Sequence, residues 1–195
     1  MKKINSKGFT LIELLAVITI MGILMLVAIP AVSRTIENSR RDTYMDTAKA
    51  YVNAVKNAVA ADELYVSEKP ISAQPSGYYY YGFKTVGDDS SATDLMEQGG
   101  KSSWGNSDVY GCVGIKKTVN ATDGRTSYKY AVQLVDDGGR GIETLVLDTA
   151  LKRSDVKTSN IDVSTDVKKA AFMVATGAWP GESTAATWVQ ITGLG

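Results

Sequence analysis

Residues 9–32, FTLIELLAVITIMGILMLVAIPAV, contain one charged side chain, Glu13, in 24 residues. As an α-helix, residues 9–29 alone would span about 31 Å, which matches the hydrocarbon thickness of a bilayer. The run is apolar on every face and follows a short basic segment, which argues against a buried core helix. The sequence therefore predicts a membrane-spanning helix over residues 9–32.

Basic side chains flank this segment on both sides. Those before it are Lys2, Lys3 and Lys7, and those shortly after it are Arg34, Arg40 and Arg41. Counted as lysine and arginine, the charges that orient a membrane segment are tied, and the free amino terminus favours a cytoplasmic N-terminus only weakly.

Two ordinary interpretations of the apolar run leave features unexplained. A secretory signal peptide cleaved near residues 31–33 would have a hydrophobic region of about 7–15 residues, far shorter than this one. A plain signal anchor explains the length, but it gives no reason for Glu13. A charge inside hydrocarbon costs about 2.5 kcal/mol or more and usually has a functional partner.

A third interpretation accounts for the carboxylate. The stretch KGFTLIELL, residues 7–15, resembles the leader junction of type IV pilins and pseudopilins. The resemblance covers about the first 35 residues and implies that a membrane peptidase removes a leader, residues 1–8, by cutting after Gly8. It also implies N-methylation of Phe9 and a role in assembly for Glu13. Gly22 and Pro30 fall where many family members have a glycine and a helix-bending proline.

Cleavage after Gly8 would place a positive amine on Phe9, four residues before Glu13. In a filament, the carboxylate of an incoming subunit can meet the amine of a neighbour in a low-dielectric environment. Each charge is costly when buried alone and tolerable when paired. We therefore expect loss of Glu13 to impair assembly more than folding.

Beyond the membrane segment, residues 33–64 read as the amphipathic half of the same helix. Its apolar stripe consists of Tyr44, Ala48, Tyr51, Val52, Val55 and Val59. Pro30 lacks a backbone donor, so we expect a bend where the helix leaves the membrane. Residues 65–195 are expected to form the globular head.

The sequence pattern of residues 65–195 predicts an α+β head. Residues 67–107 are expected to be mainly a long connection with one short strand, in which the tyrosines of residues 78–81 alternate in packing one face. Three β-strands are predicted at residues 109–119, 127–135 and 142–148. An antiparallel meander packed on the helix stripe is the expected architecture, which matches the pilin fold that the resemblance implies.

The C-terminal region gives weaker signals. Residues 164–176 are predicted to form a short helix with Ser164 as its N-cap and Gly177 as its stop, and residues 188–191 a final strand. Many members of the resembled family tie this region down with a disulfide. The chain has one cysteine, Cys112, which we expect to be a small core residue without special reactivity.

Composition and motifs argue against an enzyme. The chain has no histidine, and no nucleophile–base pair, phosphate loop or zinc spacing is present. The acids of residues 136–137 and 88–89 lack the spacing of a calcium loop and are expected to be solvated turn residues. Residues 120–122 fit an N-glycosylation sequon, to which we assign no function. No cofactor or metal is expected.

These observations predict a structural subunit, a major pilin, of a type IV pilus. It would sit in the cytoplasmic membrane as a single-pass protein and then in an extracellular filament. Its partners would be a prepilin peptidase, the inner-membrane assembly machinery, other pilins and copies of itself. A minor pilin or secretion pseudopilin remains the alternative, and an adhesive or DNA-uptake head the third. Without the leader, 18 basic residues face 21 acidic ones, which argues against nucleic-acid binding.

Overall fold

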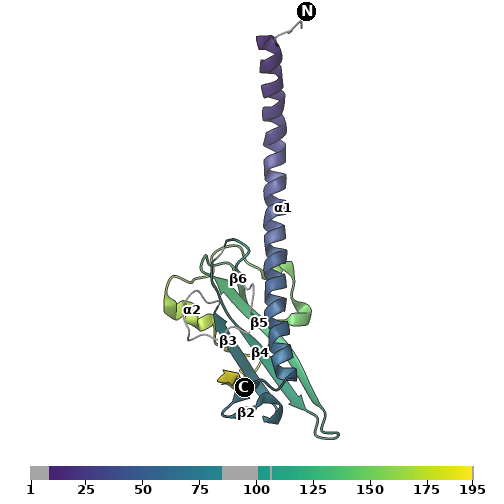
Figure 1. The fold of residues 1–195 in the computed structure, drawn as a ribbon, viewed down its shortest axis with the longest axis vertical. Helices are drawn as coiled ribbons and strands as arrows, with labels where there is room; N and C mark the ends of the chain where they lie inside the picture. The colour runs from purple at the N-terminus through teal and green to yellow at the C-terminus, as the bar shows by residue number, and fades with distance from the viewer. Residues whose placement is uncertain (1–8, 85–100, 106, 195) are drawn as a thin grey trace, which may run out of the picture. The chain divides into compact units, whose positions relative to one another are not determined.

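The computed structural model describes residues 9–84, 101–105 and 107–194 (Figure 1). Its contacts divide the chain into two compact units, Met1–Ser39 and Arg40–Gly195. One helix, α1, spans Leu11–Ala60 and so contributes to both units. The predicted leader, residues 1–8, lies outside the described residues.

The first unit presents apolar side chains on every side of α1. From Phe9 to Ile36 its large hydrophobic residues are between 90% and 48% exposed. Among the described residues, α1 is the one helix long and apolar enough to cross a membrane, as judged by length and composition. Gly22 and Pro30 both lie inside the helix, whose assignment is uninterrupted there. The bend at these two residues remains a prediction.

In the second unit, α1 ends at Ala60, four residues before the predicted boundary at residue 64. Asp62 adopts a left-handed conformation with φ of 57°, and the amide of Glu63 donates to the carbonyl of Ala58 at 2.9 Å. This turn ends the helix, because a non-glycine residue with positive φ breaks the helical repeat. Leu64 is instead the first residue of strand β1, Leu64–Val66, and is fully buried.

The predicted apolar stripe of the helix is confirmed. All six of its residues are buried, and Ala58 joins them. They pack with the inner face of a five-stranded sheet in one hydrophobic cluster, in which the rings of Tyr51 and Phe83 stack with centroids 3.9 Å apart. The chain is therefore α+β, with a long N-terminal helix packed on a mostly antiparallel sheet.

The large sheet has the order β6-β5-β4-β3-β7. Its strands are β3 (Gly77–Lys84), β4 (Val109–Val119), β5 (Thr126–Asp136), β6 (Gly141–Leu147) and β7 (Trp188–Gln190). The meander β3 to β6 is antiparallel, and β7 joins the outer edge of β3 in parallel. The three predicted strands lie within one residue of β4, β5 and β6 at each end.

Shorter elements complete the head. A small sheet of order β2-β1-β8 adds β2 (Lys69–Pro70) and β8 (Gly193–Leu194) to β1. Three 3-10 turns occupy Ile71–Ala73, Asp148–Ala150 and Arg153–Asp155, and helix α2 spans Asp166–Phe172. The region expected to be mainly a connection thus contains a full strand, β3, although residues 85–100 and 106 lie outside the described residues.

Alternation along the strands gives the large sheet two different faces. Tyr79 and Tyr81 belong to the cluster on the α1 side, whereas Tyr80 packs with Cys112 and Ala175 on the opposite face. Because side chains alternate at every residue of a strand, consecutive tyrosines serve both cores. The predicted alternation is confirmed, and the packing of the second face by the C-terminal region is an addition to it.

The predicted C-terminal helix differs from the observed one at both ends. Thr165, one residue after the predicted Ser164, caps α2 by accepting a hydrogen bond from the amide of Lys168 at 3.3 Å. The helix ends at Phe172, four residues before the predicted end, and Gln133 of β5 donates its side-chain amide to the carbonyls of Phe172 and Val174. This long-range contact has no local sequence signal.

Aromatic packing holds the C-terminal segment on the sheet without a disulfide. The Trp188 ring lies 5.9 Å from that of Trp179 and 5.7 Å from that of Tyr78, and its indole nitrogen donates to the carbonyl of Gly177. Glu182 accepts hydrogen bonds from Tyr78 and Lys116. The bond from Lys116 is the main reason that the pKa of Glu182 lies below its usual value.

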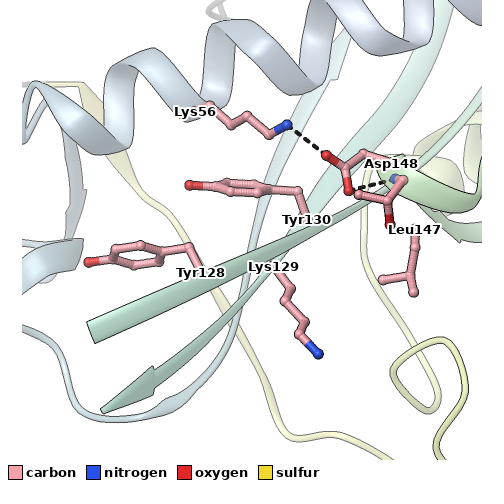
Figure 2. A pocket seen from close by; sticks show the side chains of 7 residues that line it. Lys56, Tyr128, Lys129, Tyr130, Leu147 and Asp148 are labelled. Carbon is pink, nitrogen blue, oxygen red and sulfur yellow. Dashed lines mark hydrogen bonds and ion pairs between the residues drawn. The ribbon is translucent and has the colours of Figure 1, made fainter. Parts of the chain in front are cut away.

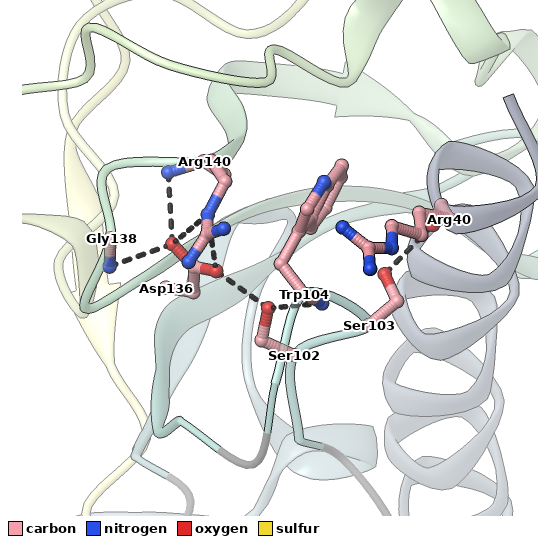
Figure 3. Close-up of polar contacts among 7 residues, drawn as sticks. All are labelled: Arg40, Ser102, Ser103, Trp104, Asp136, Gly138 and Arg140. Atoms are coloured by element: carbon pink, nitrogen blue, oxygen red, sulfur yellow. Dashed lines mark hydrogen bonds and ion pairs between the residues drawn. The ribbon is translucent and has the colours of Figure 1, made fainter. Parts of the chain in front are cut away.

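The turn between β5 and β6 is organised by a buried carboxylate (Figure 3). Asp136 is fully buried and accepts from Ser102 at 2.5 Å, from the Gly138 amide at 2.9 Å, and from Arg140 Nε at 3.1 Å. The prediction that Asp136 is a solvated turn acid is therefore wrong. Burial is possible because every interaction supplies a donor to the charge.

The contacts around Asp136 also connect residues 101–105 to the head part of α1, which is the part from Arg40 onward. The Arg140 guanidinium lies over the Trp104 ring, with 5.5 Å to its centroid, and that ring is 5.4 Å from the ring of Tyr44. Ser103 donates to the carbonyl of Arg40 at 2.7 Å, as Figure 3 shows. One carboxylate thus fixes a hairpin turn, a loop and one side of the helix together.

We expect Asp136→Asn to lower the free energy of unfolding by about 3 kcal/mol, since it leaves the Arg140 charge without its counter-ion. The adjacent Asp137 forms a partly exposed ion pair with Lys169 at 2.6 Å, so Asp137→Asn should cost at most about 1 kcal/mol. Denaturant unfolding of the full chain in detergent micelles, followed by tryptophan fluorescence, measures both. Equal losses of unfolding free energy for the two variants would contradict the central role assigned to Asp136 in this turn.

Candidate processing and assembly site

The candidate site lies at the N-terminal end of α1. Phe9 is 90% exposed and lies two residues before Leu11, the first residue of the helix. Glu13 is the third residue of the helix and lies in its first turn. Of the predicted site residues, the structure thus places Phe9 and Glu13 at one helix end and Gly22 and Pro30 further along it. Gly8 lies outside the described residues.

Thr10 and Glu13 form a reciprocal capping box. The amide and the hydroxyl of Thr10 both donate to Glu13 Oε2 at 2.8 Å, and the Glu13 amide donates to Thr10 Oγ1 at 3.4 Å. These bonds satisfy backbone donors that a helix N-terminus otherwise leaves unpaired. They define Thr10 as the N-cap of α1 and explain why the helix begins at Leu11.

Sequence reasoning missed Thr10, although a signal for it was present. Threonine followed three residues later by glutamate, directly before an apolar run, is the pattern of a capping box. Local geometry therefore gives Glu13 a structural role that is separate from assembly. The carboxylate is stabilised within its own chain by two donors and by the positive end of the helix dipole.

The two hydrogen bonds from Thr10 leave the other carboxylate oxygen of Glu13 available to a further donor. Both Thr10 donors reach Oε2, and neither of these bonds uses Oε1. A carboxylate has about four acceptor positions, so Glu13 can keep its cap while it accepts from a further cation. Held at the first turn with an exposed apolar side chain on either side, the group is placed to pair with an amine presented by another molecule.

Two threonine hydroxyls of the apolar unit are satisfied within the helix. Thr19 donates its hydroxyl to the carbonyl of Ala16 at 2.8 Å, and Thr35 donates to that of Ala31 at 3.0 Å. Back-bonding of this kind removes the cost of placing a hydroxyl in an apolar environment. Between Leu14 and Val32, therefore, α1 presents side chains that are compatible with lipid or with another apolar helix.

The one cysteine of the chain has a packing role in the head. Cys112 is fully buried, and burial raises the pKa of its thiol well above the usual value, so the reactive thiolate is disfavoured. Its expected role as a small core residue agrees with this environment. Across the described residues, no group of three metal-ligating side chains comes together. Asp88 and Asp89 lie outside the described part of the chain.

Lys117 is a second residue that sequence reasoning missed. Its side chain is buried and its ammonium donates to the carbonyls of Ile71, Ser72 and Gln74, at 3.0, 2.6 and 2.6 Å. Three carbonyls replace the water that the charge loses on burial. The residue therefore binds the turn after β2 to strand β4, which is a structural role.

Comparison with known proteins bears on the N-terminal end. Residues 3–29 match the family model described as the prokaryotic N-terminal methylation motif. The match includes Gly8, Phe9, Glu13 and Gly22 and ends one residue before Pro30. No curated protein and no solved structure matches the chain.

The described part of the match, residues 9–29, contains the capped, apolar end of α1, and the match agrees with the pilin-like α+β arrangement of helix and sheet. The motif is that of prepilins, whose family is structural and not enzymatic. Residues 3–29 of this chain carry the prokaryotic N-terminal methylation motif, which supports a type IV pilin-like or pseudopilin protein.

Proposed function

We propose that this chain is the precursor of the major structural subunit of a type IV pilus. The observation that carries the proposal is the methylation motif at the start of an apolar helix that is exposed on all sides. A soluble monomer rarely exposes a contiguous apolar surface of more than a few hundred Å². The surface of residues 9–36 therefore needs two successive environments, which are lipid before assembly and other subunits afterwards.

Processing is the first step of the proposal. A prepilin peptidase cuts between Gly8 and Phe9, which removes three lysines and creates a new amine, and the amine is then methylated. Thr10 and Glu13 both lie after the cut, so the capping box survives it. The processed subunit spans the cytoplasmic membrane through residues 9–32 until the inner-membrane assembly machinery transfers it to the filament.

Assembly is the second step. The helices of neighbouring subunits bury their apolar surfaces against one another, with the domain of residues 65–195 as the head. Oε1 of Glu13 accepts from the Phe9 amine of a neighbouring subunit, and the surrounding apolar side chains strengthen that pair. The head uses packing in place of a disulfide, which suits a chain with a single cysteine.

The mass of the mature protein tests processing. We expect protein from sheared cell surfaces to begin at Phe9 and to carry one additional methyl group, as measured by intact mass and N-terminal sequencing. A chain that begins at Arg34 would indicate a secretory signal peptide, and one that retains Met1 an uncleaved anchor. Dominance of this chain in the sheared fraction distinguishes a major pilin from a minor pilin or a pseudopilin.

Three substitutions separate the capping role of the site from its charge. Glu13→Gln keeps an acceptor for Thr10 but removes the charge. We expect normal amounts of subunit in the membrane and a fibre yield reduced by at least about tenfold, because the amine then has no counter-ion. Thr10→Ala keeps the charge and loses a cap worth about 1 kcal/mol, so fibres should persist. Glu13→Ala should resemble Glu13→Gln in fibre yield.

The measurement is the amount of subunit in sheared fibres relative to that in membranes, by immunoblot. Normal fibres from the Glu13→Gln strain would defeat the charge-pairing mechanism. Loss of fibres in Thr10→Ala, with Glu13→Gln unaffected, would assign Glu13 to helix capping alone.

A further inference from the structure

A pocket of about 350 Å³ opens in the head, beside the head part of α1 (Figure 2). Its origin is a step at the edge of the large sheet. The pairing of β6 with β5 ends where Leu147 lies opposite Ala131, and the chain then enters the 3-10 turn Asp148–Ala150. Strand β5 continues without β6 beside Tyr130, which is buried, and Tyr128, which is half-buried.

Two tyrosines form one wall of the pocket. Tyr128 and Tyr130 are two residues apart on β5, so their rings lie on the same face of the strand, and Figure 2 shows them side by side. Burial raises the pKa of both phenols, that of Tyr130 to about 12, so both hydroxyls stay protonated at physiological pH. Leu147 adds an aliphatic surface.

An internal ion pair forms the polar side. Lys56 of α1 donates to Asp148 Oδ2 at 2.6 Å and lies over the Tyr130 ring, 5.4 Å from its centroid. The backbone amide of Thr149 donates to the other oxygen of Asp148 at 2.8 Å. The Lys129 side chain points away from this pair, as Figure 2 shows. Donors and acceptors therefore adjoin each other, and the charges of Lys56 and Asp148 cancel.

We propose that this pocket binds a neutral carbohydrate unit. Sugar hydroxyls both donate and accept, which suits the ammonium, the carboxylate and the hydroxyls of Thr149 and the tyrosines. The C–H faces of a sugar ring suit the tyrosine rings and Leu147. The pocket volume lies at the lower end of the range for small-molecule sites, which is about 300–1,000 Å³.

Charge decides between this ligand and others of similar size. A phosphate or carboxylate ligand needs an uncompensated cation inside the pocket. Lys56 is already neutralised by Asp148, and the side chain of the second lining cation, Lys129, points away from that pair (Figure 2). A cationic ligand meets the same obstacle, because Lys56 holds the carboxylate. An uncharged ligand rich in hydroxyl groups is the class that loses least when it leaves water for this environment.

The inference extends the proposed function by giving the subunit a surface ligand. One weak site per subunit becomes effective when the subunit is repeated along a filament, because further contacts then form at high effective concentration. The site itself depends only on the head. Its test is therefore independent of whether cleavage and fibre formation occur.

The test uses the full chain in detergent micelles and three soluble neutral probes: maltotriose, cellotriose and tri-N-acetylchitotriose. Saturation-transfer NMR and titration measure binding to each. We expect at least one probe to bind, and Tyr128→Ala to weaken it at least fivefold. Tyr65→Ala removes another half-buried tyrosine, outside the pocket lining, and should leave binding unchanged.

Thermal unfolding of each variant checks that the head remains folded. Thr149→Val provides a second variant, which removes a rim hydroxyl without opening the core, and it should also weaken binding. The proposal is overturned if no probe binds, if binding survives both pocket substitutions, or if equal loss in Tyr65→Ala shows that the contact lies elsewhere. Preference for an anionic sugar or a peptide over all three probes would equally overturn it.

Discussion

The exposed apolar surface of the first half of α1 is the constraint on which the rest of the structure depends. Residues 9–36 present large hydrophobic side chains in every direction, and their polar backbone groups are satisfied within the helix. Such a segment is stable in lipid or among identical helices and unfavourable in water. This part of the helix therefore requires an apolar environment, and the head packs on the other half of the same helix.

The charge at Glu13 has to be compatible with that apolar environment. Its capping box with Thr10 stabilises the carboxylate locally, so the helix start and the charged group depend on each other. Because these bonds use one carboxylate oxygen, the residue can serve both the fold of a single chain and a contact between chains. A glutamate deeper in the helix would find all backbone donors already used and would have no local stabilisation.

The head has no internal disulfide to stabilise it, so other contacts have to hold its distant segments together. Three contacts between distant segments replace one: Asp136 with the loop of residues 101–105, Lys117 with the turn after β2, and the aromatic contacts of Trp179 and Trp188 with β3. Each joins parts of the chain that are more than thirty residues apart in sequence. The buried charges are tolerated only because several donors or acceptors surround each of them.

Features that depend on local pattern could be predicted from the amino-acid sequence. The apolar run, its interrupting carboxylate, the stripe on residues 44–59 and the three strands of the meander all follow from hydrophobic periodicity and turn residues, and the structure has them within a few residues. Thr10 belongs to the same class, since a capping box is a local pattern.

Features that depend on partners distant in sequence became visible in the folded chain. The end of α2, the burial of Asp136 and Lys117, the parallel addition of β7 and the step that opens the pocket at Tyr128 all require knowing which segments meet. The residues next to Asp136 in sequence predict an ordinary turn. The Asp136 carboxylate is buried because the fold places Ser102 and Arg140 beside it as donors. Periodicity reports which side of an element is apolar, whereas the location of a buried charge depends on where its distant donors lie.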